Sequence, residues 1–406
     1  MTEDDRPHTD GARFRDVLAD PQFFALWLAQ LLSVLGDQVA RVALAVLVFT
    51  ETASAGLTAL TYALTFLPDL VAGPLLSGIA DRAPRRLTMV VSDLLRAGVL
   101  ALMAVPGMPF WALCVLVVAG QLIAAPFAAA RAAILPHVLT GERYVVASAV
   151  SGTTYQSGQV LGFALGGPLV ALVGVPTALL ADAATFVVSA AILQLGVAEQ
   201  RATGGSESIA GLRDGARIVL GDRRLRALVA LACVSAFVVT IEGLAAPYAA
   251  ALGGGPVAVG LLLAANPLGA ALGIVVIARL VPPGRRDRLL GPLAIASCVP
   301  LIASALDPSL GVVVALWVVS GLACAYQVPA NAAFVAAVPD AHRGQAFGLA
   351  VTALRVTQGL GVLLAGLLAE ATGPARAVAA AGVVGVLVAA GCALAWSRAR
   401  GGERRG

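Results

Sequence analysis

The stretch Gly73–Arg86, GPLLSGIADRAPRR, closes a long apolar segment with a cluster of arginines. The same alternation runs through the whole chain, in which all 27 basic residues are arginine. Most of them lie in every second gap between about twelve apolar stretches, each long enough to span a bilayer. The intervening gaps, which hold no arginine, lie near Thr52, Gly107, Gly174, Gly254 and Pro308. Because basic residues beside membrane spans remain on the cytoplasmic side, the pattern predicts that both termini are cytoplasmic.

The composition is that of an integral membrane protein. Hydrophobic residues make up 59% of the 406 residues, charged residues make up 12%, and the mean hydropathy is +0.90. These values lie outside the range of soluble globular chains. We therefore predict an all-α, multi-pass protein of the cell inner (plasma) membrane, with twelve transmembrane helices and no cleaved signal peptide. The basic loops face lipid headgroups and lack the interleaved aromatics of a nucleic-acid site, so we expect no nucleic-acid partner.

The chain divides into two similar halves. An offset of 200 residues aligns Gly73 with Gly273 and Arg143 with Arg343. Such repeats are typical of transporters with two related bundles. We expect a cytoplasmic tail at 1–22, a six-helix bundle at 23–197, a cytoplasmic linker at 198–224, a second six-helix bundle at 225–398 and a tail at 399–406. The amphipathic run 209–220 predicts a short helix within the linker.

Several motifs resemble one transporter family. The stretch Gly73–Arg86 resembles the signature loop between the second and third helices of the major facilitator superfamily. Three further motifs, Leu28–Gln30 with Gly36–Asp37, Ser92–Arg96 (SDLLR) and Pro339–Gly348 (PDAHRGQAFG), resemble the exporter branch that includes macrolide-efflux and siderophore-exporting proteins. The resemblance implies the major facilitator fold, made of two pseudo-symmetric six-helix bundles around a central cavity.

Ionisable residues inside apolar stretches mark candidate functional positions. A charge at mid-bilayer costs between about 2.5 and 17 kcal/mol, so each of them needs a partner or a water-filled cavity. The candidates are Asp37, Arg41, Asp69, Asp182, Glu242 and Arg355.

Asp37 and Glu242 are the candidates for proton coupling. Each lies about 21 to 23 Å along its helix from the cytoplasmic end, at a rise of 1.5 Å per residue. An apolar cavity disfavours the ionised carboxyl, which suits a group that takes up and releases a proton. The alternative for Asp37 is a permanent ion pair with Arg41, four residues along the same helical face.

Polar side chains on the same helices are candidates to line the central cavity. Gln30, Gln38 and Arg41 share the span of Asp37. In the family that the chain resembles, the first, fourth, seventh and tenth helices line the cavity, which implies that Gln121, Gln327 and Asn331 lie there too.

Two further sets of charges have both a functional and a structural interpretation. An ion pair between Asp69 and Arg355 would join the two bundles, either as a switch that breaks during transport or as a fixed structural contact. The loop residues Asp81, Arg82, Arg85 and Arg86 either obey the orientation rule alone or form a cytoplasmic gate. The gate is implied by the resemblance, with Asp81 facing a helix dipole of the other bundle.

Glycines recur every four residues at Gly158, Gly162 and Gly166. Small residues at this spacing allow close helix packing. The run also resembles the glycine-and-proline motif of proton-driven antiporters.

No pattern for an enzyme, a metal site or a cofactor is visible. The three histidines lie in polar ends or loops, the five cysteines lie unpaired within apolar spans, and a phosphate-binding loop with lysine is impossible in a chain without lysine. The sequence therefore favours a monomeric secondary transporter that exports small hydrophobic or amphipathic compounds, drug-like or siderophore-like, by proton antiport with alternating access. An importer or uniporter is the alternative, and a non-transporting receptor or scaffold is a more distant one.

Overall fold

The computed structural model describes residues 14–68, 83–200 and 209–402, and these residues form helices and connecting turns without a β-strand. The first group of helices comprises α1 (Phe14–Leu18), α2 (Pro21–Thr52), α3 (Ala55–Ala63), α5 (Arg85–Met103), α6 (Phe110–Val138), α7 (Glu142–Val173) and α8 (Val175–Gly196). After α9 (Ile209–Gly221), the second group comprises α10 (Arg223–Cys233), α11 (Ser235–Gly243), α12 (Ala245–Ala251), α13 (Pro256–Leu280), α14 (Pro283–Ile302), α15 (Leu310–Cys324), α16 (Gln327–Ala337), α17 (Arg343–Thr372) and α18 (Pro374–Gly402).

Within the described residues, ten helical segments are long and apolar enough to cross a membrane. The prediction of an all-α, multi-pass membrane protein is confirmed to that extent. Helix α5, the predicted third span, carries Arg85, Arg86, Asp93 and Arg96 among its 19 residues and is correspondingly less apolar. The linker between the two groups contains α9, which packs against α17.

Local sequence explains where the helices begin and end. Asp20 caps α2, because its carboxylate accepts hydrogen bonds from the backbone N–H groups of Gln22 (2.9 Å) and Phe23 (3.0 Å). Asp222 caps α10 in the same way. Gly174 separates α7 from α8 with a φ of 79°, a left-handed conformation that glycine adopts without strain.

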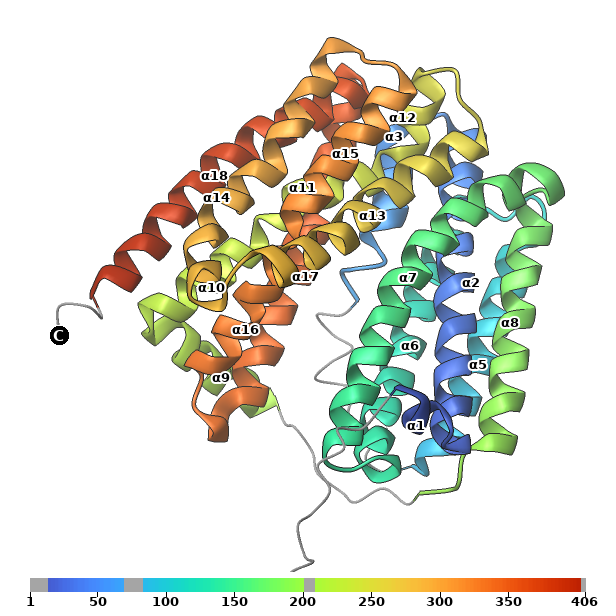
Figure 1. Cartoon of the computed structure of the whole chain (residues 1–406). Helices are drawn as coiled ribbons and strands as arrows, with labels where there is room; N and C mark the ends of the chain where they lie inside the picture. Colours follow the sequence, from blue (N-terminus) through green and yellow to red (C-terminus); the bar gives the residue numbers. More distant parts are fainter. Residues whose placement is uncertain (1–13, 69–82, 201–208, 403–406) are drawn as a thin grey trace, which may run out of the picture.

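The two groups of helices meet at one end of the molecule. Figure 1 shows them close together where α3 and α12 lie, and apart where α1 and α9 lie. The contact between them is made by α7 against α13 and by α3 against α17. Glycines permit it: a Cβ on Gly167 would lie 2.6 Å from the carbonyl oxygen of Pro256, and one on Gly260 would lie 2.7 Å from that of Phe163. The backbones of the two groups therefore touch directly at this end.

The glycines that the sequence marks on α7 face α2 within the first group. A Cβ on Gly158 would lie 2.7 Å from Val34, one on Gly162 would lie 2.7 Å from Gln38, and one on Gly166 would lie 3.1 Å from Val42. The spacing of four residues thus keeps one face of α7 bare where it lies against α2.

Gly162→Ala should lower the free energy of unfolding, because the added methyl meets both Gln38 and the carbonyl oxygen of Leu35. Overpacking of this kind costs roughly 1–3 kcal/mol. Gly152→Ala on the same helix is the matched control, since nothing lies within 4 Å of a Cβ there. Unfolding of the purified protein by SDS titration in mixed micelles measures both variants. Equal effects of the two substitutions would contradict the packing argument.

Candidate functional site

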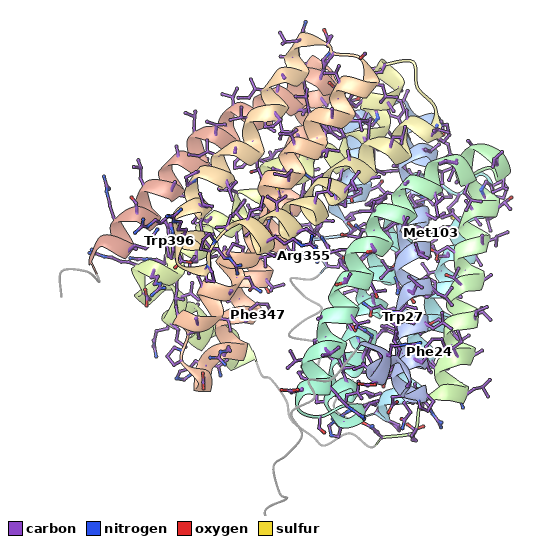
Figure 2. The ribbon with its side chains drawn as sticks, viewed as in Figure 1. Phe24, Trp27, Met103, Phe347, Arg355 and Trp396 are labelled. Atoms are coloured by element: carbon purple, nitrogen blue, oxygen red, sulfur yellow. The ribbon has the colours of Figure 1, made fainter. Side chains whose placement is uncertain are left out.

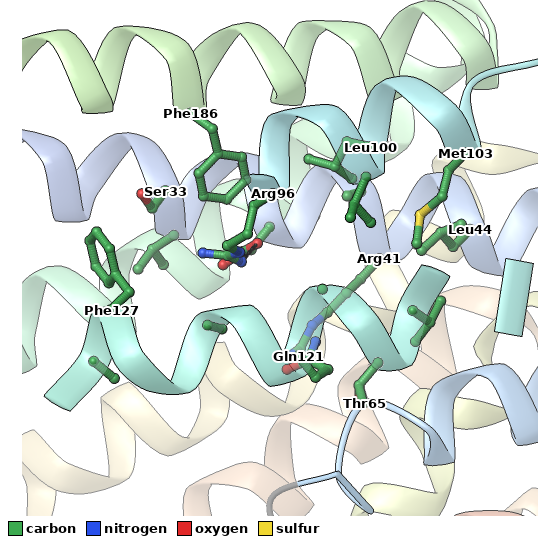
Figure 3. Close-up of a pocket in the computed structure, with 18 of the residues that line it drawn as sticks. Ser33, Arg41, Leu44, Thr65, Arg96, Leu100, Met103, Gln121, Phe127 and Phe186 are labelled. Carbon is green, nitrogen blue, oxygen red and sulfur yellow. Dashed lines mark hydrogen bonds and ion pairs between the residues drawn. The ribbon is translucent and has the colours of Figure 1, made fainter. Parts of the chain in front are cut away.

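A cavity of about 290 Å³ lies inside the first group of helices. It is bounded mainly by α2, α5 and α6, and its walls combine apolar side chains with several polar ones (Figure 3). The polar and charged residues that line it are Gln30, Ser33, Asp37, Arg41, Thr65, Arg96, Gln121, Arg131 and Tyr155.

Asp37 forms an ion pair with Arg96 and not with Arg41. The Arg96 guanidinium of α5 lies 2.6 Å from the Asp37 carboxylate of α2, and the Arg96 side chain is only 12% exposed. The guanidinium also stacks 4.1 Å from the centre of the Phe186 ring on α8, as Figure 3 shows. Arg41 turns instead toward Tyr62 on α3. The Asp37–Arg41 pair that spacing along one helix allowed is therefore wrong, because a neighbouring helix supplies the cation.

Two further carboxyls lie behind this pair. Asp93 on α5 is fully buried and accepts a hydrogen bond of 2.6 Å from Ser189. Asp182 on α8 is also buried and accepts one of 3.1 Å from Thr185. Each has a second oxygen without a hydrogen-bond partner among the described residues. The sequence marks Asp182 as an intramembrane charge without a role and includes Asp93 only within the Ser92–Arg96 motif.

A second network joins the two groups of helices. The Tyr62 hydroxyl on α3 donates a hydrogen bond to the Glu242 carboxylate on α11 and accepts one of 3.4 Å from Arg41 on α2. Arg355 on α17 lies 5.5 Å over the ring of Phe66 in the first group, and it interacts electrostatically with Glu242. Figure 2 places Arg355 between the two groups. Sequence reasoning missed Tyr62, and the available signal was that a buried tyrosine hydroxyl needs a partner.

Arg131 on α6 belongs to a third polar cluster at the cavity wall. It donates hydrogen bonds to the Gln30 side-chain carbonyl and to the Ser151 hydroxyl, the latter at 3.1 Å. Gln30 in turn donates to the Ser151 carbonyl at 3.2 Å. These bonds tie α2, α6 and α7 together.

Three of the residues predicted to line the central cavity lie elsewhere in the structure. Gln38 is buried against α7 and does not line the cavity, because Gly162 brings the two helices together at that point. Gln327 and Asn331 line a separate cavity of about 350 Å³ between α10, α16 and α17.

The structure describes only some of the residues predicted for the inter-bundle pair and for the cytoplasmic gate. Asp69, Asp81 and Arg82 lie outside the described residues. Arg85 donates a hydrogen bond of 2.9 Å to the Ala133 carbonyl, and Arg86 forms an ion pair of 2.8 Å with Glu199. The inter-bundle pair and the cytoplasmic gate therefore stay predictions.

The chain belongs to the Major Facilitator Superfamily, whose family model matches residues 26–253 and 227–406. No curated protein matches the sequence. The family and the fold are those of membrane transporters, which are generally not enzymes.

Solved structures of transporters share the fold. A bacterial homologue of the human lysosomal transporter Spinster, in an inward-facing and unoccupied conformation, is 18% identical with a TM-score of 0.71, and the match covers 93% of this chain and 96% of that one. The nucleoside transporter NupG is 13% identical with a TM-score of 0.73, over 92% and 99% of the two chains. A POT family transporter in complex with 5-aminolevulinic acid is 12% identical with a TM-score of 0.69, over 90% and 94%. At these identities the likeness establishes the fold alone.

The Asp37–Arg96 pair should show strong energetic coupling in a double-mutant cycle with Asp37→Asn and Arg96→Gln. Neighbours in one salt-bridge network couple by about 0.5–3 kcal/mol, and we expect a value within that range, because Arg96 is only 12% and Asp37 34% exposed. The matched control is the Arg86–Glu199 pair, whose side chains are 25% and 40% exposed, so its coupling should be about 0–1 kcal/mol. Free energies of unfolding of the two cycles provide the comparison. A coupling for the first pair no larger than that of the control would refute this assignment.

Proposed function

We propose that this protein exports small hydrophobic or amphipathic compounds, drug-like or siderophore-like, in exchange for protons, by alternating access. The observation that carries the proposal is the hydrogen bond from Tyr62 to Glu242. It places an intramembrane carboxylate of the second group against the first group, beside Arg41. A carboxylate at such a boundary links its protonation state to the relative position of the two groups.

The contacts of Glu242 link its protonation to the relative position of the two groups. In the arrangement with the groups together at the α3 end, the Glu242 carboxylate accepts the hydrogen bond of Tyr62 and lies near the guanidinium of Arg41. Separation of the groups at that end removes the Tyr62 contact, so the affinity of the carboxyl for a proton differs between the two arrangements. A membrane potential of 100 mV supplies about 2.3 kcal/mol per charge moved, to which the proton gradient adds.

The same proposal assigns the sides of the membrane. The arginine-rich turns and both termini face the cytoplasm, so the end at which the groups lie apart (Figure 1) opens inward. We assign the remaining two of the twelve predicted spans to the apolar stretch 54–80 of the sequence and to α5. We place the protein as a monomer in the inner (plasma) membrane. Import or uniport of a small molecule is the alternative function, and a nucleoside transporter is among the structures that share the fold.

Glu242→Gln should abolish proton coupling, because an amide keeps the shape of the side chain but does not titrate. We expect transport driven by a pH gradient in proteoliposomes to fall roughly tenfold or more. Exchange of the cargo without a gradient should persist. Susceptibility profiling of deletion and overexpression strains selects the compound. Glu142→Gln, at an exposed position, is the matched control. Wild-type flux that is indifferent to pH would support uniport instead.

Cysteine labelling tests the orientation. In a background without native cysteines, Gly107→Cys and Pro308→Cys should react with an impermeant maleimide added outside cells, and Arg143→Cys should react only after permeabilisation. This outcome follows from the rule that arginine-bearing turns stay inside. Labelling of all three positions from the same side would contradict the proposed topology.

A further inference from the structure

We propose that Arg131, with Gln30, binds an anionic oxygen group of the cargo, so that the transported compounds are amphipathic anions such as carboxylates, sulfonates or phosphates. This inference rests on the proposed transport function and names its substrate class. It concerns the cavity of about 290 Å³ in the first group of helices.

The charges that line this cavity are mostly positive. Three arginines, Arg41, Arg96 and Arg131, reach its wall, and Asp37 is the one carboxylate among its described lining residues. Asp37 is already paired with Arg96. Asp93 and Asp182 are buried behind that pair and do not line the cavity. A cationic compound would therefore meet repulsion here, whereas an anion is attracted.

Arg131 differs from the other two arginines in its partners. Arg96 has the Asp37 carboxylate, and Arg41 interacts with Tyr62 and with the nearby Glu242 carboxylate. Arg131 donates only to the neutral oxygens of Gln30 and Ser151, and its Nε is buried without a hydrogen-bond partner in the described part of the chain. A guanidinium held away from bulk water without a carboxylate is costly, and a ligand oxyanion offsets that cost.

The surrounding residues fit the planar fork of arginine binding an oxyanion. Gln30 and Ser151 fix the Arg131 side chain from α2 and α7, so little rotamer freedom remains to be lost when a ligand binds. Phe127, four residues earlier on α6, also lines the cavity and supplies apolar surface on the same helix face. A ligand with an anionic oxygen group and an apolar body would contact both the Arg131 guanidinium and the Phe127 side chain.

The length of the cavity favours a compound with a head and a body. Gln30, beside Arg131, and Arg41 are eleven residues apart on α2, which corresponds to about 16 Å at 1.5 Å per residue. Between these ends the wall includes Val34, Phe127 and Phe186, together with Ser33 and the Asp37–Arg96 pair. An anionic head at Arg131 thus leaves a wall of apolar side chains and one already neutralised ion pair for the rest of the molecule.

Two fluorescent probes that differ in one charged group test this inference. The anion 8-anilinonaphthalene-1-sulfonate and its uncharged analogue N-phenyl-1-naphthylamine are titrated against the purified full-length protein in phosphatidylcholine nanodiscs. Arg131→Gln should weaken binding of the sulfonate roughly 10- to 100-fold, the effect of losing a hydrogen-bonded charge contact, with the uncharged probe within about twofold of wild type. Arg131→Lys should retain the preference for the sulfonate. Arg143→Gln, at an exposed position outside the cavity, should leave both affinities unchanged.

Three outcomes overturn the inference. They are wild-type protein that binds the sulfonate no tighter than the uncharged probe, an Arg131→Gln variant with unchanged affinities, and one that loses both probes equally. The last result would assign Arg131 a structural role. None of these readouts involves proton movement. Coupling that depends on Glu242 would therefore survive such a failure, and only the substrate class would fall.

Discussion

The constraint on which this structure depends is that charges in a bilayer must be held by partners. The Asp37–Arg96 pair shows how the fold meets it. One charge comes from α2 and the other from α5, and the Phe186 ring of α8 covers the guanidinium. Breaking a partly buried pair leaves an uncompensated charge, which is costly where water reaches it poorly. The ion pair therefore fixes the positions of three helices relative to each other, and with them the wall of the cavity.

Close packing at glycines is the second feature that holds the helices together. The glycines of α7 that face α2 and Gly167, which contacts Gly260 of α13, lie on the same helix, where Gly166 immediately precedes Gly167. Helix α7 thus lies against its own group along one face and against α13 along another. Association of helices in lipid relies on such van der Waals contact, because lipid tails provide no hydrophobic drive. A contact built from backbone atoms has few side chains to repack, which suits an interface that opens and closes.

The sequence predicts the spans and the positions of the charges better than it predicts their partners. The apolar stretches and the arginine pattern predict an all-helical membrane protein, since both follow from local composition. The ion pair of Asp37 joins residues 59 apart in the chain, and the Tyr62–Glu242 hydrogen bond joins residues 180 apart. Helix periodicity identifies neighbours three or four residues away. It therefore predicts Arg41 as a partner of Asp37 and cannot predict Arg96, which lies on another helix. Arg131 was not among the predicted site residues, because it follows the fourth apolar stretch in the sequence, whereas α6 continues to Val138 and brings its side chain to the cavity.

The two cavities differ in a way that bears on alternating access. The cavity of the first group carries arginines and Asp37, whereas Gln327 and Asn331 are the amides in an otherwise apolar cavity of the second group. Moving a charge through the hydrocarbon is costly, whereas moving an apolar wall past a fixed charge is not. A cycle in which the first group holds the charged end of a cargo therefore keeps that charge beside the fixed charges of one packed unit. Glu242 of the second group contacts the first group through Tyr62. Under the proposed function, cargo recognition at Arg131 therefore lies inside the first group, and proton coupling at Glu242 lies at the boundary between the two groups.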